Sequence, residues 1–171
     1  MGGYSSEAEI SLKSGEVVFN SLDASKYALY KVYILKEKWF VKHNKQEYCV
    51  LKDDFSVIID EEHIQFDCVF NAIHGDPGEN GALIAYFDLL GIKHTSAPFY
   101  QMALTFNKRD TLSVVKEYGI PIAKSFYLHQ RDEIDTGRII KKVGLPCFVK
   151  PNRAGSSFGI SKVYKEENLK V

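Results

Sequence analysis

Segments with the pattern of strands alternate with segments with the pattern of helices, and this alternation limits the fold more than any other feature of the sequence. Apolar residues recur at helical spacing from Glu7 to Leu22, and a strand-like run rich in Tyr, Val and Ile follows at 28–35. Further strands are predicted at 39–41, 48–51, 57–59, 68–73, 122–128 and 147–150, and further helices at 83–90, 98–106, 108–118 and 134–143. This order is typical of an α/β fold.

The compact apolar segments at 57–59 and 68–73 are of the kind that lies buried in a parallel sheet. We therefore expect residues 1–105 to form a three-layer, Rossmann-like N-terminal domain around such a sheet, and residues 106–171 to begin a second domain. A parallel α/β domain normally begins with a strand, whereas this chain opens on Gly2-Gly3 and a helix. We expect that a leading strand and the rest of the second domain are missing from the chain.

The composition excludes several classes of function. The chain has 22 basic and 22 acidic residues, so no net charge draws it to nucleic acid or lipid. Basic residues do not cluster with aromatic ones, and no apolar stretch approaches the roughly 20 residues that span a bilayer. Residues 1–85 carry 8 basic and 14 acidic side chains and the remainder 14 and 8. An anionic ligand is therefore expected in the second part, with neither nucleic acid nor a membrane as partner.

The three cysteines, Cys49, Cys68 and Cys147, are an odd and widely spaced set without a C-x-x-C pair. This spacing excludes a fully paired disulfide framework and the usual four-ligand zinc site. Cys68 and Cys147 lie in apolar runs, where a buried thiol is expected. The cysteines therefore predict a reducing, cytoplasmic compartment.

Two loops in the first half have residue types that bind anions or charged substrates. The loop at 2–7 has two glycines and ends in Glu7, which serves either a ligand or the start of the following helix, where an acidic side chain is favoured by the helix dipole. The loop at 74–81, H-G-D-P-G-E-N-G, lies between a predicted strand and a helix, where ligands bind in open α/β sheets. His74 at its start either meets a substrate or is a hydrogen-bonded residue at a strand end.

The third loop follows the predicted strand at 147–150. Lys150 ends an apolar strand, where an unpaired ammonium is costly to bury and favours an anionic partner. A G-S-S-x-G loop follows directly at 155–159, with small donors that can surround phosphate oxygens. A flexible loop beside a surface lysine is the alternative. Because the lysine and the loop occur together, the sequence favours a phosphate site.

Together these loops resemble the D-alanine–D-alanine ligase family of the ATP-grasp superfamily. The resemblance rests on G-G-Y-S-S-E-A-E-I-S (2–11), H-G-D-P-G-E-N-G (74–81) and K-P-N-R-A-G-S-S-F-G-I-S-K-V (150–163). It continues in Y-F-D-L-L-G-I (86–92), A-L-T-F-N-K (103–108) and V-G-L-P-C-F-V-K-P (143–151). It implies a pre-ATP-grasp domain followed by the first part of an ATP-grasp domain. It also implies ATP-dependent joining of two D-alanines for peptidoglycan precursors and cell wall biogenesis.

The resemblance assigns Glu7 and His74 to substrate binding and Glu7 and Ser156 to catalysis. Glu7 matches the glutamate that engages the amino group of the first D-alanine, and His74 matches a histidine near the reacting acyl group. Ser156 matches the serine that is hydrogen-bonded to that glutamate. In the family, ATP phosphorylates the carboxylate of the first D-alanine, and the amine of the second attacks the acyl phosphate.

The resemblance assigns three further residues to ATP. Lys108 and Lys150 match the two lysines that hold the phosphates, and Ser157 matches a neighbouring phosphate contact. The Mg²⁺ ligands are expected beyond residue 171, so no metal ligand is predicted in this chain, and the 171-residue chain alone is expected to be inactive. Asn80 stands where the family more often has Asp. A homodimer is implied by the family alone.

Two alternatives stay open. Another ATP-grasp carboxylate–amine ligase, such as a D-alanine–D-lactate ligase, fits the same motifs, because the residues that choose the second substrate are expected outside this chain. A catalytically inactive α/β module that binds a nucleotide or a partner protein is the alternative from a different class.

Overall fold

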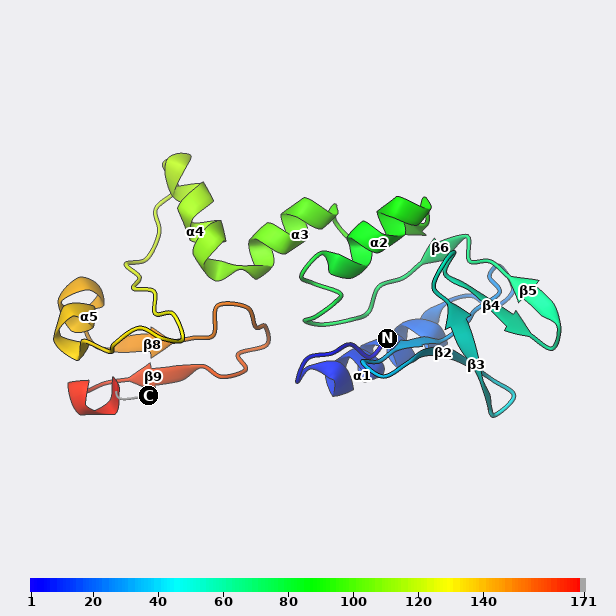
Figure 1. The fold of residues 1–171 in the computed structure, drawn as a ribbon, viewed down its shortest axis with the longest axis horizontal. Helices are drawn as coiled ribbons and strands as arrows, with labels where there is room; N and C mark the ends of the chain where they lie inside the picture. Colours follow the sequence, from blue (N-terminus) through cyan, green and yellow to red (C-terminus); the bar gives the residue numbers. More distant parts are fainter. Residues whose placement is uncertain (170–171) are drawn as a thin grey trace. The chain divides into compact units, whose positions relative to one another are not determined.

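The computed structural model describes residues 1–169, which divide into a first unit, Met1–Phe106, and a second unit that begins at Asn107 (Figure 1). The helices of the first unit are α1 (Ala8–Ser21), α2 (Ala82–Leu90) and α3 (Phe99–Phe106). Its strands are β1 (Val32–Ile34), β2 (Trp39–His43), β3 (Gln46–Leu51), β4 (Ser56–Ile59), β5 (Glu62–Ile64), β6 (Cys68–Val69) and β7 (Lys93–His94).

The first five strands form one antiparallel sheet in sequential order, β1 to β5. Two of its connections are the two-residue turns Asn44-Lys45 and Asp60-Glu61, whose φ values are 47°, 67°, 49° and 70°. Positive φ at both central residues is the type I′ geometry that closes antiparallel hairpins, whereas a parallel connection needs a crossover of about a dozen residues. The prediction of a parallel sheet is therefore wrong for 57–59, which lies in β4.

Parallel pairing among the described residues occurs between β6 and β7 and at one isolated bridge between Gly2 and Ile34. The strand predicted at 68–73 is shorter than expected. Beyond Val69, the N–H of Ile73 donates to the side chain of Asn71 at 3.1 Å. This N–H is therefore not available for pairing with a neighbouring strand. The chain is thus an α/β protein with mixed strand pairing.

The core of the first unit joins this sheet to α2. Phe55 and Phe87 are buried with ring centroids 4.8 Å apart, and Trp39 contacts Phe55 edge to face at 6.1 Å. The other buried members are aliphatic side chains of the sheet, of α2 and of the loop before residue 74, namely Ile34, Val41, Val50, Val57, Ile59, Ile73, Leu83 and Ile84. Burying such side chains supplies most of the driving force for folding.

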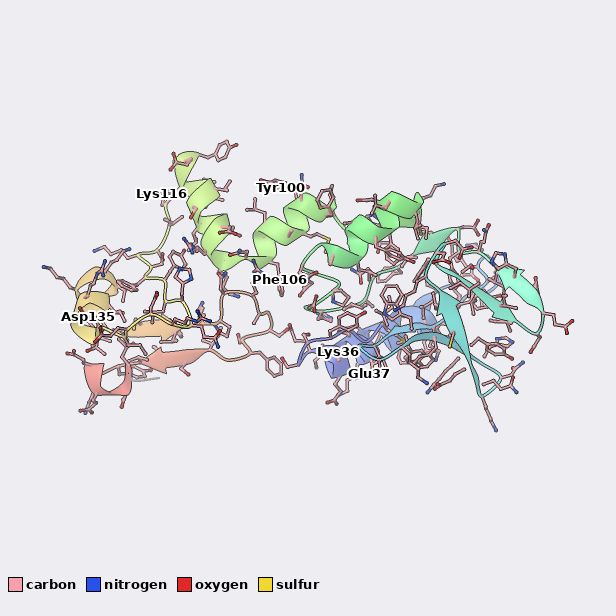
Figure 2. The ribbon with its side chains drawn as sticks, in the orientation of Figure 1. Lys36, Glu37, Tyr100, Phe106, Lys116 and Asp135 are labelled. Carbon is pink, nitrogen blue, oxygen red and sulfur yellow. The ribbon has the colours of Figure 1, made fainter. Side chains whose placement is uncertain are left out.

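The second unit consists of α4 (Lys108–Glu117), α5 (Thr136–Val143), the antiparallel hairpin of β8 (Cys147–Val149) and β9 (Ser161–Val163), and a 3₁₀ turn at Glu166–Leu169. Asp135, labelled in Figure 2, accepts a hydrogen bond from the N–H of Arg138 at 2.9 Å and so caps α5.

Two sequence predictions are wrong in their detail. No strand is present at 122–128. Phe126 of this run instead packs on a small core of Ile139, Val163 and Leu169, so its apolar side chain is partly buried without strand pairing. The thiols expected to be buried are not: Cys68 is exposed and Cys147 is partly exposed. Cys68 lies on β6, a strand of two residues in a two-stranded sheet.

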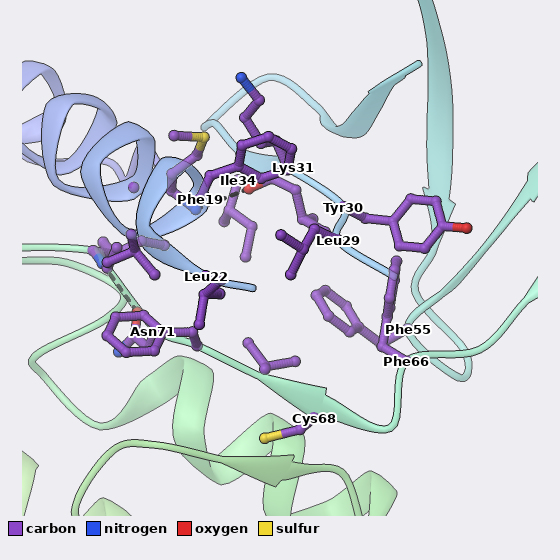
Figure 3. A pocket seen from close by; sticks show the side chains of 18 of the residues that line it. Phe19, Leu22, Leu29, Tyr30, Lys31, Ile34, Phe55, Phe66, Cys68 and Asn71 are labelled. Atoms are coloured by element: carbon purple, nitrogen blue, oxygen red, sulfur yellow. Dashed lines mark hydrogen bonds between the residues drawn. The ribbon is translucent and has the colours of Figure 1, made fainter. Parts of the chain in front are cut away.

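A pocket of the first unit lies between α1 and the chain around β1 and β6 (Figure 3). Its lining is mostly apolar and includes Phe19, Leu22, Tyr30, Phe55 and Phe66. None of the six residues that the sequence singled out lines this pocket. The candidate site is therefore elsewhere.

Candidate active site

Glu7 is the one charged residue of the loop at 2–7, and it is buried, with 2% of its surface exposed. Its Oε1 atom is buried and has no hydrogen-bond partner in the described part of the chain. A buried carboxylate oxygen left unpaired is costly, and buried polar atoms are almost always satisfied. This atom is therefore a candidate acceptor for a cationic or N–H-bearing ligand.

The backbone around Glu7 is fixed by two serines. The Glu7 N–H donates to Oγ of Ser5 at 3.1 Å, and the hydroxyl of Ser11 donates to the Glu7 carbonyl at 3.1 Å. Glu7 is the N-cap residue of α1, but its side chain makes no capping hydrogen bond. The carboxylate is thus held beside the helix start without being used by it.

His74 lies in the loop that packs on this segment, and three serines bind it. Its N–H donates to Oγ of Ser11 at 2.9 Å, its carbonyl accepts from the hydroxyl of Ser5 at 3.2 Å, and its ring Nε2 lies 3.0 Å from Oγ of Ser14. The alternative prediction is a hydrogen-bonded histidine at the end of a strand. The hydrogen bonds are present, but β6 ends at Val69, so His74 does not lie at a strand end. The structure therefore brings His74 and Glu7 together through shared serines. We call Ser5, Glu7, Ser11, Ser14, His74 and Gly75 the N-terminal cluster.

Gly75 lies directly against the Glu7 carboxylate. A Cβ atom at this position would come 2.4 Å from Oγ of Ser5 and 2.9 Å from Oε2 of Glu7, and the residue has φ +72°. Both the close approach and the positive φ require glycine. The glycine that the motif places after His74 thus lets the loop reach the carboxylate.

Gly75→Ala is expected to lower the free energy of unfolding of the first unit by about 2–4 kcal/mol, from left-handed strain together with overpacking against Ser5 and Glu7. Gly91→Ala is the matched control, because Gly91 has φ +69° but nothing within 4 Å of its Cβ position. Urea unfolding followed by the fluorescence of Trp39, the single tryptophan, reports on this unit. Equal losses in the two variants would mean that Gly75 is not packed on Glu7.

Lys108 opens α4 in the second unit and contacts the loop that follows β8. Its ammonium donates to the carbonyl of Ala154, and lies 3.5 Å from the carbonyl of Asn152. The Lys108 N–H also donates to the Asn152 carbonyl at 3.2 Å. The helix start and the glycine–serine loop, which are more than 40 residues apart in sequence, therefore lie side by side.

Two asparagines join this helix start to the loop. The side chain of Asn107 caps α4 by accepting from the N–H of Asp110 at 3.2 Å, and it also accepts from Nδ2 of Asn152 at 2.8 Å. Oδ1 of Asn152 in turn accepts from the N–H of Arg109 at 2.9 Å. Asn107 is buried, so this junction is a fixed part of the second unit.

The remaining candidates lie along the same loop and are exposed. The Lys150 ammonium lies 5.4 Å from the ring centre of Phe148, a cation–π distance. Ser156 and Ser157 have φ values of 47° and 61°. The two hairpin turns of the first unit have the same left-handed backbone at consecutive residues, so the φ values of Ser156 and Ser157 describe a tight loop and do not by themselves indicate a ligand. We call Asn107, Lys108, Lys150, Asn152, Ser156 and Ser157 the C-terminal cluster.

Two stretches of the chain match the models of one known family. Residues 1–97 match the family described as "D-ala D-ala ligase N-terminus", and residues 114–171 match "D-ala D-ala ligase C-terminus". The chain belongs to the D-alanine–D-alanine ligase family. The resemblance seen in its sequence motifs is thereby confirmed.

Curated and solved members of the D-alanine–D-alanine ligase family resemble the chain over its whole length. The D-alanine–D-alanine ligase of Flavobacterium johnsoniae is 59% identical over 100% of this chain and 53% of the relative, and that of Christiangramia forsetii is 55% identical over 99% and 52%. The crystal structure of D-alanyl-alanine synthetase A from Vibrio cholerae has a TM-score of 0.82 at 29% identity, covering 98% of this chain and 51% of that one. The chain spans about half the length of the curated relatives that it matches.

Four members of the two clusters, Ser11, Ser14, Asn107 and Asn152, were not predicted from the sequence of this D-alanine–D-alanine ligase family member. Ser11 and Ser14 follow Glu7 by four and seven residues, which is the spacing of one helix face, so their pattern was a usable signal. Asn107 precedes the predicted helix at 108–118 and has the residue type of an N-cap. Asn152 carries no such signal, because its partners on α4 are distant in sequence.

Asn80, the departure from the family pattern, uses both ends of its amide. Its Nδ2 donates to the Asp76 carboxylate and its Oδ1 accepts from the Ala82 N–H at 3.0 Å. An aspartate could accept from Ala82 but could not donate to Asp76. The amide therefore suits a loop that already contains Asp76.

Two further kinds of site find no support in the described residues. Between residues 1 and 169, no group of three or more His, Cys, Asp or Glu side chains is arranged to hold a metal ion. Over the same range, no helix is long and apolar enough to cross a membrane.

Proposed function

We propose that this chain supplies the D-alanine-binding part and the first ATP-binding part of a D-alanine–D-alanine ligase. The observation that carries the proposal is the buried Glu7 carboxylate, whose Oε1 atom lacks a partner beside His74. An ammonium group is the ligand that such an atom binds best, through a charge-assisted hydrogen bond. The family to which the chain belongs joins amino acids that each carry one.

In the proposed reaction, Glu7 binds the ammonium of the first D-alanine and fixes its orientation. A carboxylate oxygen of that D-alanine attacks the γ-phosphorus of ATP and ADP leaves, which forms an acyl phosphate. The amine of the second D-alanine then attacks the acyl carbon, and inorganic phosphate leaves. His74 lies next to Glu7 through the shared serines, where its ring can meet the reacting acyl group. Most of this catalysis is positioning and charge neutralisation.

The C-terminal cluster is proposed to hold ATP through its phosphates. Lys108 and Lys150 supply two ammonium groups, and Ser157 supplies a hydroxyl and a backbone N–H at an exposed, left-handed loop position. In this role the Lys108 ammonium exchanges the carbonyl of Ala154 for a phosphate oxygen. Ser156 is proposed to act in the same reaction as Glu7, as the family resemblance implies.

The finer architecture follows from the same proposal. Residues 1–105 are the three-layer, pre-ATP-grasp domain and residues 106–171 the first part of the ATP-grasp domain, with Mg²⁺ held by residues outside the chain. D-alanine and ATP are the partners in a cytoplasmic protein, with neither nucleic acid nor a membrane bound, and a homodimer is the assembly that the family suggests.

The experiment is a chimera in which this chain replaces the matching residues of the Flavobacterium johnsoniae relative. The purified chimera should form ADP only when both ATP and D-alanine are present, and mass spectrometry should identify D-alanyl-D-alanine. L-alanine is the control substrate. ADP formation that is indifferent to D-alanine, while the unaltered relative responds to it, would contradict the proposal and favour an inactive nucleotide-binding module.

The same assay tests the other ligase. D-lactate offered together with D-alanine gives an ester product if the second substrate is a hydroxy acid. We expect dipeptide to dominate at neutral pH. The chimera takes about half of its sequence from the relative. Its preference between D-alanine and D-lactate is therefore attributed to this chain only where it differs from the preference of the unaltered relative.

A further inference from the structure

Ser14 is the only one of the three serines around His74 that contacts its ring. Oγ of Ser14 lies 3.0 Å from Nε2, while Ser5 and Ser11 bind the backbone of the same residue. No hydrogen bond joins the other ring nitrogen, Nδ1, to the described residues. A neutral imidazole has one nitrogen that donates and one that accepts, and a hydrogen bond at one nitrogen decides which is which.

A comparison within α1 favours Ser14 as the donor of this hydrogen bond. The hydroxyl of Ser11 donates to the carbonyl of Glu7 at 3.1 Å, and the hydroxyl of Ser21 donates to the carbonyl of Val17 at 2.7 Å, each four residues earlier in the chain. Ser14 makes no such bond to the helix backbone. Nε2 of His74 is the one acceptor that its hydroxyl has among the described residues.

We infer that Ser14 is a positioning residue that donates its hydroxyl hydrogen to Nε2 and so holds the neutral ring of His74 in the Nδ1–H form. This inference rests on the proposed function for its consequence, because it makes Nδ1–H the donor that faces the substrate. A fixed N–H donor can bind an oxygen of the carboxylate or acyl phosphate as negative charge moves onto it. Ser14 itself touches no substrate and acts through the ring.

The other two serines around His74 do not replace this bond, because their hydroxyls already have partners. Ser11 already uses its oxygen to accept from the His74 N–H and its hydrogen to donate to Glu7. The hydroxyl of Ser5 donates to the His74 carbonyl. Removing the Ser14 hydroxyl therefore takes away the one hydrogen bond that Nε2 has among residues 1–169, and the ring is then free to change its protonated nitrogen and its orientation.

The first test measures the ring directly and does not depend on ligase activity. The chain is labelled with ¹⁵N at its five histidines, and the ring signals are recorded at a pH at which imidazole is neutral. A His74→Asn variant identifies the signals of His74. We expect His74 in the Nδ1–H form in the unaltered chain, a shift towards the Nε2–H form in Ser14→Ala, and retention of the Nδ1–H form in Ser14→Thr, which keeps the hydroxyl.

Ser21→Ala is the matched control, because it removes a serine hydroxyl from the same helix without touching His74. It should leave the ring signals unchanged. An Nε2–H ring in the unaltered chain, or an Nδ1–H ring that persists in Ser14→Ala, would overturn the inference. Both results would leave the proposed ligase function untouched.

The second test measures turnover in the chimera. Loss of one hydrogen bond should lower kcat of Ser14→Ala about two- to tenfold, with KM for ATP unchanged and with rescue in Ser14→Thr. A purely structural role would lower the amount of folded enzyme without changing kcat per folded molecule. A chimera without activity in any form would count against the proposed function, while the ring signals would still decide the role of Ser14.

Discussion

Glu7→Gln in the chimera is expected to lower kcat/KM for the first D-alanine about 100-fold or more. The variant keeps the shape of the side chain but removes the charge that is proposed to pair with the substrate ammonium at a buried position. Losing one partner of a buried charge pair costs about 2–5 kcal/mol, and ~1.4 kcal/mol is tenfold in an equilibrium. The measurement is the steady-state rate of ADP formation against D-alanine concentration at saturating ATP.

Glu9→Gln is the matched control for this variant. Glu9 lies two residues further along α1, is exposed, and pairs with Lys13 on the helix surface at 2.8 Å. Exposed ion pairs of this kind contribute little, so kcat/KM should stay within about twofold. If Glu7→Gln also stayed within twofold, Glu7 would not bind the substrate, and its unpaired oxygen would need another explanation.

Lys150→Ala is expected to raise KM for ATP about 10- to 100-fold, with a smaller effect on KM for D-alanine. A lysine acts on phosphate as a point charge, and a hydrogen bond to a charged group contributes about 1.5–3 kcal/mol. Both Michaelis constants are measured in the chimera, each with the other substrate saturating. The two constants separate a phosphate contact from general damage to the site.

Lys162→Ala is the control for Lys150, because its ammonium lies 5.6 Å from the same Phe148 ring, compared with 5.4 Å for Lys150. It removes an exposed charge from the neighbouring strand and should leave KM for ATP within about twofold. An unchanged ATP constant and turnover in Lys150→Ala would contradict the assignment of Lys150 to the phosphates.

The elements that could be predicted from the sequence are those that local signals define. The helical spacing from residue 7 to residue 22 gave α1 to within a residue at each end, and Gly91 ends α2 as expected, with a left-handed φ. The direction of strand pairing depends instead on the turns. Neither Asn44-Lys45 nor Asp60-Glu61 contains the glycine that usually signals a type I′ turn, so the antiparallel sheet was not expected.

The candidate site shows the same division. Glu7 and His74 could be selected from loops whose residue types indicate a ligand, whereas Lys108 was assigned only by its match to the family motif at 103–108. Their surroundings could not be selected in the same way, since Ser11 reaches residue 74 and Asn152 reaches residue 109 only after folding. A run such as 122–128 reads as a strand on its own, but strand formation needs a partner that the described second unit does not offer it.

The central claim is the proposal, drawn from the family resemblance, that Glu7 and Ser156 act in the same reaction. A double-mutant cycle in the chimera, with Glu7→Gln, Ser156→Ala and the double variant, measures their interdependence as a coupling energy in kcat/KM. Residues that share a hydrogen bond couple by about 0.5–3 kcal/mol, whereas distant residues add within about 0.3–0.5 kcal/mol. Ser113→Ala replaces Ser156→Ala in a control cycle, because Ser113 donates to Arg109 on the surface of α4. We expect coupling with Ser156 and additivity with Ser113, and additivity in both cycles would contradict the claim.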